Sequence, residues 1–174
     1  MQRLVPLGHD DHMTDRNADV EELHRRLAEE EERLQYTRFG HDEAWQLGSR
    51  IRELARTRDL PVAIGVDLGE QAVFRAGLPG STRDNDRWLA RKFATVRYFA
   101  KCSLATMAMG QHPGIYEILA LDRTTYALAG GAFPIRVNGA LVGAVGVSGL
   151  TDVEDHELVV EALEELTAEA SRVD

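Results

Sequence analysis

The sequence predicts an α+β domain in which one antiparallel sheet of about five strands is covered by helices. One hairpin is indicated by Asn138-Gly139, which lies between two β-rich runs and favours a tight turn with positive φ at both positions. A second pattern of strand, turn and strand occurs earlier, at residues 62–76. Helical patterns precede, separate and follow these hairpins, and this order is typical of α+β rather than βαβ architecture.

The chain begins with a segment that has no apolar periodicity. Residues 1–16 are therefore expected to form a flexible leader, and one folded domain is expected over residues 17–174. From Asn17 to Gln35, apolar residues recur at helical spacing on a narrow stripe, opposite the acidic run Glu29 to Glu32. A stripe this narrow is compatible with packing across the domain edge or against a second subunit.

A second helix is expected after Gly40, with a broad apolar face that ends before Pro61. Residues 62–68 and 72–76 follow as two strands joined by a tight turn at residues 69–71. The residues expected to form the buried face of the helix are Ala44, Leu47, Gly48, Ile51, Leu54 and Ala55.

The next helix, expected to be capped by Asp84 or Asn85, carries the most basic stretch of the chain. Its mixture of cations and aromatic surface suits an anionic small molecule, and Asn85, Trp88, Arg91 and Lys92 are candidate ligand-binding residues. The alternative is that the apolar residues are core while the cations are solvated or pair with the acidic first helix. The basic residues of this stretch are Arg83, Arg87, Arg91, Lys92, Arg97 and Lys101.

The segment between this helix and the second hairpin is less regular. Its Cys102 is the only cysteine, which excludes a disulfide within the chain, and it is expected to be buried. Residues 115–121 fit either a strand or a short helix. Gly130-Gly131 predicts a left-handed turn into a strand at residues 133–137, or else a pocket wall of exposed amides.

The terminal helix begins with the capping-box pattern of Thr151 and Glu154. Glu154-Asp155-His156 is a cluster of carboxylates and histidine at the start of this helix, and the helix dipole alone accounts for the two acids. His156 is therefore a candidate for proton transfer, together with His112 in the turn His112-Pro113-Gly114. The sequence contains no P-loop, Rossmann fingerprint or H-E-x-x-H motif.

Several of these segments resemble the GlcG/HbpS-like family of haem-degrading-domain proteins. The resemblance rests on Gly130-Gly131 followed by Pro134-Ile135, and on residues 142–149, which read VGAVGVSG. Asp84–Lys92, followed by Phe99 and Ser103, and Glu154–His156 are similar to a cytosolic branch of that family. The similarity extends over about residues 20–170.

The resemblance implies a profilin-like or PAS-like layout and assembly as a dimer or higher homo-oligomer. It places Gly130-Gly131 beside the ligand cleft of related proteins, so Gly130, Gly131, Phe133 and Ser148 join the candidate ligand-binding residues. The resemblance also makes haem a candidate cofactor. His41 and His112 are candidate axial ligands, although the chain has no haem motif such as C-x-x-C-H.

Composition narrows the classes of function. The chain has 29 acidic and 20 basic residues and a formal net charge of −9, which argues against nucleic acid as a partner. No apolar run approaches the roughly 20 residues of a membrane span, and the first residues lack the apolar core of a signal peptide. These features predict a cytoplasmic protein without a membrane partner.

The leading functional hypothesis is a small-molecule-binding domain that acts as a homo-oligomer and binds haem or another planar anionic ligand. One alternative is a small enzyme that acts on a carboxylate-bearing substrate in the same cleft, with Arg91 or Lys92 binding the carboxylate. The other is an assembly or adaptor protein that uses the acidic first helix as its contact surface.

Overall fold

Six α-helices and one short 3-10 helix surround a four-stranded sheet in the part of the chain that the computed structural model describes, residues 11–170. The elements, in chain order, are α1 (Asp11–Arg33), α2 (His41–Thr57), β1 (Ala63–Leu68), β2 (Gln71–Gly77), α3 (Arg83–Phe99), the 3-10 helix η1 (Ser103–Thr106), α4 (Met107–Gly110), α5 (Ile115–Ile118), β3 (Ala132–Val137), β4 (Ala140–Ser148) and α6 (Asp152–Ala170).

The sheet has the strand order β2-β1-β4-β3, and every neighbouring pair is antiparallel. This confirms the α+β class. The sheet has four strands rather than the expected five or so, because residues 115–121 form no strand and contain the short helix α5 at Ile115–Ile118. Gly114 and Ala120, which flank this helix, both have positive φ, and the chain therefore turns sharply at each end of α5.

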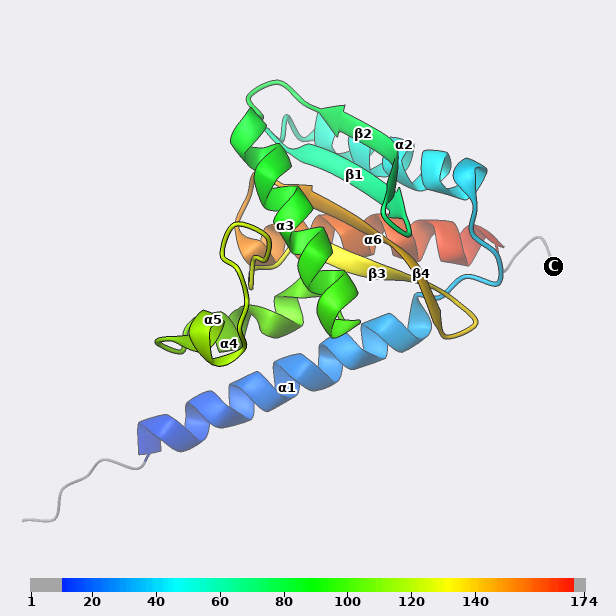
Figure 1. Ribbon diagram of the computed structural model, residues 1–174. Coiled ribbons are helices and arrows are strands. Elements are labelled where there is room, and N and C mark those ends of the chain that lie inside the picture. Colours follow the sequence, from blue (N-terminus) through cyan, green and yellow to red (C-terminus); the bar gives the residue numbers. More distant parts are fainter. Residues whose placement is uncertain (1–10, 171–174) are drawn as a thin grey trace, which may run out of the picture.

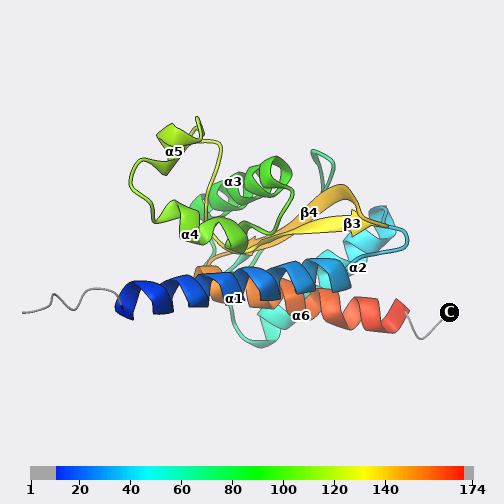
Figure 2. The same cartoon turned by 90° about the horizontal axis from the view of Figure 1, so that it is seen from below.

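The helices are arranged in layers on the two faces of the sheet. Helix α3 covers one face, while α2 and α6 lie side by side on the other (Figures 1 and 2). Helix α1 crosses the lower side of the molecule in Figure 1, next to α6 and η1, and its N-terminal half extends past the sheet. No helix in residues 11–170 combines the length and apolarity needed to cross a membrane.

The apolar core is divided by the sheet. The larger part lies between the sheet and α2 and α6, and α1 contributes Leu27 and Leu34 to it. A smaller cluster of Leu89, Phe93 and Val96 attaches α3 to the opposite face. All six residues predicted for the buried face of α2 are buried, because that face meets the sheet and α6.

Helix α1 begins at Asp11, six residues before the expected start at Asn17. Residues 1–10 of the predicted leader lie outside the described residues. Within the chain, Leu27 and Leu34 are each 1% exposed, so the narrow apolar stripe packs against the domain edge at these two positions.

The turns and caps follow the local sequence, with one correction. Asn138 and Gly139 have φ values of 49° and 87°, as the predicted hairpin turn requires. The capping box of α6 is present, with Thr151 Oγ1 2.6 Å from Glu154 Oε2. The cap of α3, however, is Thr82 rather than Asp84 or Asn85, and its backbone N–H donates to Asn85 Oδ1 at 2.8 Å. Helix α3 therefore begins two or three residues earlier than expected.

Candidate functional site

Lys92, predicted to bind an anionic ligand, lies in the interior of the protein. Its Nζ donates to Asp155 Oδ2 at 2.7 Å and to the Val147 carbonyl at 3.3 Å. The two side chains of this ion pair are only 3% and 1% exposed. Burial raises the pKa of Asp155, and the attraction of Lys92 opposes this rise. The charge of Lys92 thus joins α3 to α6 within the fold.

The other candidates on α3 lie nearer the surface. The Arg91 guanidinium donates to the Tyr126 carbonyl at 3.1 Å and lies 4.4 Å from the centre of the Trp88 ring. Trp88 is 37% exposed. Asn85 serves the cap of the helix, as described above. Arg91 and Trp88 are therefore brought together, whereas Lys92 and Asn85 each have a separate structural partner.

Gly130 and Gly131 lie where β3 approaches the start of α6. A Cβ atom at Gly130 would lie 2.2 Å from the Asp152 carbonyl oxygen, and one at Gly131 would lie 2.7 Å from Lys92 Nζ. Both glycines therefore permit close packing inside the chain. Phe133 and Ser148 are also buried, on β3 and β4, and the Phe133 ring lies 5.9 Å from the ring of His156.

His156, a candidate for proton transfer, connects two helices. It is 1% exposed, and its Nε2 donates to the Glu30 carboxylate on α1 at 2.9 Å. Burial opposes ionisation of Glu30, but the hydrogen bond from His156 and the nearby Arg26 and Arg33 together lower its pKa. The other nitrogen, His156 Nδ1, is buried and has no hydrogen-bond partner in the described part of the chain.

The two candidate haem ligands lie apart from each other and from His156. His41 is exposed at the first position of α2, and His112 is exposed in the loop between α4 and α5. In residues 11–170, no group of three or more histidine, cysteine or carboxylate side chains has the geometry of a metal site. Cys102 is fully buried, as expected, and burial raises the pKa of its thiol.

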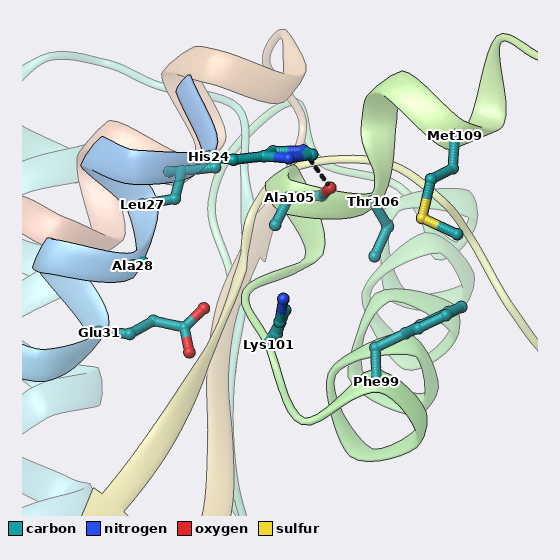
Figure 3. Close-up of a pocket in the computed structure, with 9 residues that line it drawn as sticks. All are labelled: His24, Leu27, Ala28, Glu31, Phe99, Lys101, Ala105, Thr106 and Met109. Atoms are coloured by element: carbon teal, nitrogen blue, oxygen red, sulfur yellow. Dashed lines mark hydrogen bonds between the residues drawn. The ribbon is translucent and has the colours of Figure 1, made fainter. Parts of the chain in front are cut away.

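A pocket of about 290 Å³ lies in a different place, between α1 and the segment that runs from the end of α3 to α4 (Figure 3). None of the candidate site residues predicted from the sequence lines it. Its walls are mostly apolar, with a few polar side chains at intervals. The lining residues are His24, Leu27, Ala28, Glu31, Phe99, Lys101, Ala105, Thr106 and Met109.

Three of the polar side chains in this pocket are already engaged. Glu31 Oε1 accepts a hydrogen bond from the Cys102 backbone N–H at 2.7 Å. His24 Nε2 lies 3.1 Å from the Ala105 carbonyl oxygen, and it must carry the proton of this hydrogen bond because a carbonyl only accepts. Thr106 Oγ1 donates to the Ser103 carbonyl at 2.7 Å. Each of these groups is therefore held in place before any ligand arrives.

Lys101 is different, because it forms no hydrogen bond or ion pair with the described residues. Figure 3 shows it between the side chains from α1 and those of Phe99 and Met109. Lys101 belongs to the basic stretch of the sequence, but the pocket could not be predicted from that stretch, since the opposite wall comes from α1, far away in the sequence. The spacing of charges along one segment carries no signal for such a site.

Comparison with known proteins gives a consistent family relationship. The sequence profile described as "Haem degrading protein HbpS-like" matches residues 39–164. A UPF0303 protein of Streptomyces coelicolor is 48% identical over 146 residues, which cover 82% of this chain and 92% of the relative.

Two solved structures are similar in fold. The crystal structure of the Ybr137w protein has a TM-score of 0.79 and 28% identity, and the match covers 95% of this chain and 99% of that one. The crystal structure of a PduOC:heme complex has a TM-score of 0.62 and 17% identity, with 72% of this chain and 93% of that one covered. The latter likeness shows the shared fold alone.

Proposed function

The chain belongs to the HbpS-like family, and we propose that it is a small-molecule-binding protein whose ligand occupies the pocket between α1 and the α3–α4 segment. A PduOC protein of similar fold is seen in a complex with haem, which supports ligand binding by this fold. The observation that carries this proposal is the pocket itself. A cavity of about 290 Å³ is at the lower end of the range for ligand sites, which are commonly apolar with a few well-placed polar groups.

The walls of the pocket match that description. Leu27 on α1 faces Phe99 and Met109 across the cavity, and these side chains offer apolar surface on both sides. Removing such surface from water supplies about 25 cal/mol per Å² of binding energy. The polar groups that border it are fixed by their own hydrogen bonds, which reduces the entropy lost when a ligand binds.

The residues of this pocket do not fit haem. A volume of about 290 Å³ is at the lower end of the range for sites of small ligands, too little to enclose a tetrapyrrole macrocycle. His24 is the only histidine that lines the pocket, and its Nε2 is hydrogen-bonded to the Ala105 carbonyl. The proposed ligand is therefore a smaller molecule, with a flat apolar body that suits the surface of Phe99.

The proposal can be tested with a variant that fills the pocket. Ala28 lines the cavity from an exposed position on α1, so Ala28→Phe adds bulk there without replacing a buried core residue. We expect the neutral probe 3-phenylpropan-1-ol to bind the wild-type protein in ligand-observed NMR and to lose saturable binding to Ala28→Phe. Ala18→Phe, at an exposed position of the same helix outside the pocket, should bind like wild type.

Either of two results would contradict the proposal: no saturable binding to the wild-type protein, or equal binding to Ala28→Phe and Ala18→Phe. A parallel titration with haemin examines the size argument. Saturable one-to-one haemin binding that is lost in Ala28→Phe would show that the pocket opens to admit a macrocycle.

We also propose that the protein acts as a homo-oligomer. Strand β2 is at the edge of the sheet, and edge strands carry backbone groups that can pair with another chain. Trp45 on α2 packs against Phe74 of this strand, with ring centres 5.7 Å apart, and is nevertheless 65% exposed. A large aromatic side chain beside an edge strand supports contact with a second copy at this side.

A further inference from the structure

The chain has only two lysines among its 20 basic residues, and they occupy opposite environments. Lys92 is buried in the ion pair with Asp155, whereas Lys101 lines the pocket and has no partner within residues 11–170. We infer that the pocket is an acid-binding site, in which Lys101 pairs with the carboxylate of a small amphipathic monocarboxylic acid. This inference rests on the proposed function and specifies the chemistry of its ligand.

Lys101 is not needed by the structure around it. It follows the C-terminal end of α3, where a cation commonly serves the terminal carbonyls of a helix. That role is taken by Arg136, whose Nη2 donates to the Ala100 carbonyl at 2.5 Å. The Lys101 amine is therefore available to a ligand, for which a charge-assisted hydrogen bond with a carboxylate is among the stronger contacts.

Glu31, the acid in the same pocket, already has partners of its own. One carboxylate oxygen accepts the hydrogen bond from the Cys102 N–H, and the other lies 3.7 Å from Arg136 Nη2. No ion pair within 4 Å joins Glu31 to Lys101. The negative charge of Glu31 is thus balanced elsewhere, and the unbalanced charge of the cavity is the positive charge of Lys101.

The same geometry limits the charge and size of the ligand. A single free cation beside a fixed carboxylate favours one negative charge, because a second would lie near Glu31 and be repelled. The cavity volume of about 290 Å³ leaves room for about one aromatic ring with a short chain, on the basis of about 30 Å³ per water-sized group. The apolar surfaces of Phe99 and Met109 suit such a ring.

The decisive experiment compares three probes that share a body and differ in the head group: 3-phenylpropionate, 3-phenylpropan-1-ol and 3-phenylpropylamine. We expect the wild-type protein to bind the acid more tightly than the alcohol or the amine at low salt. Lys101→Gln should weaken binding of the acid by roughly tenfold to a hundredfold and leave binding of the alcohol unchanged. Arg87→Gln, which removes an exposed cation that does not line the pocket, should leave all three affinities unchanged.

The outcomes separate this inference from the proposed function. Equal affinity for acid and alcohol, or an acid affinity that Lys101→Gln does not change, would overturn the acid-binding inference while the pocket still binds small molecules. Preference for the amine would assign the site to Glu31 instead. Failure of all three probes to bind would overturn the proposed function as well.

Chemical labelling gives an independent readout, because Lys101 is the only exposed lysine. An amine-reactive acetylating reagent should modify Lys101 and spare Lys92 in the folded protein. Saturating 3-phenylpropionate should slow the modification of Lys101, measured by peptide mass spectrometry, and should leave that of the N-terminal amine unchanged. An unchanged rate at Lys101 would contradict contact between the carboxylate and this amine.

Discussion

Lys92 and Asp155 illustrate how a charged residue on an amphipathic helix can belong to the interior. Their side chains form an ion pair at 2.7 Å that is almost fully buried. A buried charge that loses its partner is costly, because the remaining ion is removed from water without compensation. The contribution of Lys92 therefore depends on Asp155, which lies on another helix and far away in the sequence.

We predict that Lys92→Met lowers the free energy of unfolding by about 3–5 kcal/mol, since it leaves the Asp155 carboxylate buried without its cation, although the Leu150 backbone N–H still donates to it. Arg87→Met, at an exposed position of the same helix, should change it by no more than about 0.5 kcal/mol. Urea unfolding followed by circular dichroism measures both. Equal effects of the two substitutions would show that the buried pair does not matter to stability.

His156 and Glu30 give the fold a contact that depends on pH. The pKa of Glu30 is lowered in the folded protein, so the contact stabilises the protein above the pKa of an unfolded glutamate, about 4.3, and is lost as pH falls through the folded value. Wild type should exceed Glu30→Gln in stability by about 1 kcal/mol at neutral pH, because glutamine keeps an oxygen acceptor for His156 but loses the charge. This difference should shrink below about pH 4.3.

Thermal unfolding of both proteins between pH 3 and pH 7 measures this difference. His112→Ala is the matched control for a histidine without such a contact, because His112 is exposed in a loop. A stability difference between wild type and Glu30→Gln that stays constant over the whole pH range would contradict the assignment.

At the level of single elements, helix caps depend on neighbouring residues, whereas the buried face of a helix depends on the elements packed against it. The cap of α6 is fixed by residues within one turn, and Thr151 and Glu154 form it as their spacing indicates. Val153 in the same turn is apolar but 41% exposed. Local hydrogen bonds can be inferred from spacing, whereas the limits of a buried face depend on what covers it.

Removing the cap tests the local contribution. Thr151→Ala should lower the free energy of unfolding by about 1 kcal/mol, because a helix N-terminal N–H loses its side-chain acceptor. Thr151→Ser keeps the hydroxyl and should restore most of this loss. If the serine variant were as unstable as the alanine variant, packing of the threonine methyl group rather than capping would be responsible.

At the level of the whole molecule, the proposed homo-oligomer predicts a definite effect of surface charge. Trp45→Glu should shift the native mass, measured by size-exclusion chromatography with light scattering, toward that of a single chain, because it places a charge beside the edge strand β2. Ile118→Glu changes another exposed apolar residue, on α5, and should leave the mass unchanged. A single-chain mass for the wild-type protein would contradict the proposed assembly.

The sequence by itself determined the features that depend on neighbouring residues. The Asn138-Gly139 turn, the buried face of α2, the burial of Cys102 and the α6 cap all follow from spacing, turn chemistry or side-chain type within a few positions. These are sufficient for the α+β class, because two hairpins separated by helices leave few arrangements of one sheet. The family resemblance rests on the same local motifs, and the HbpS-like profile confirms it.

Only the tertiary structure decided where the charges act and where a cavity remains. Two neighbouring cations on α3 have different partners. Lys92 forms a buried ion pair with Asp155, while Arg91 donates to the Tyr126 carbonyl and lies over the Trp88 ring. The pocket at Lys101 exists because α1 lies against η1 and forms one wall, while the end of α3 and Met109 of α4 form the other. An ion pair or a pocket formed by two distant segments cannot be predicted from the residue spacing of either segment. Each segment contributes only one partner of the pair or one wall of the pocket.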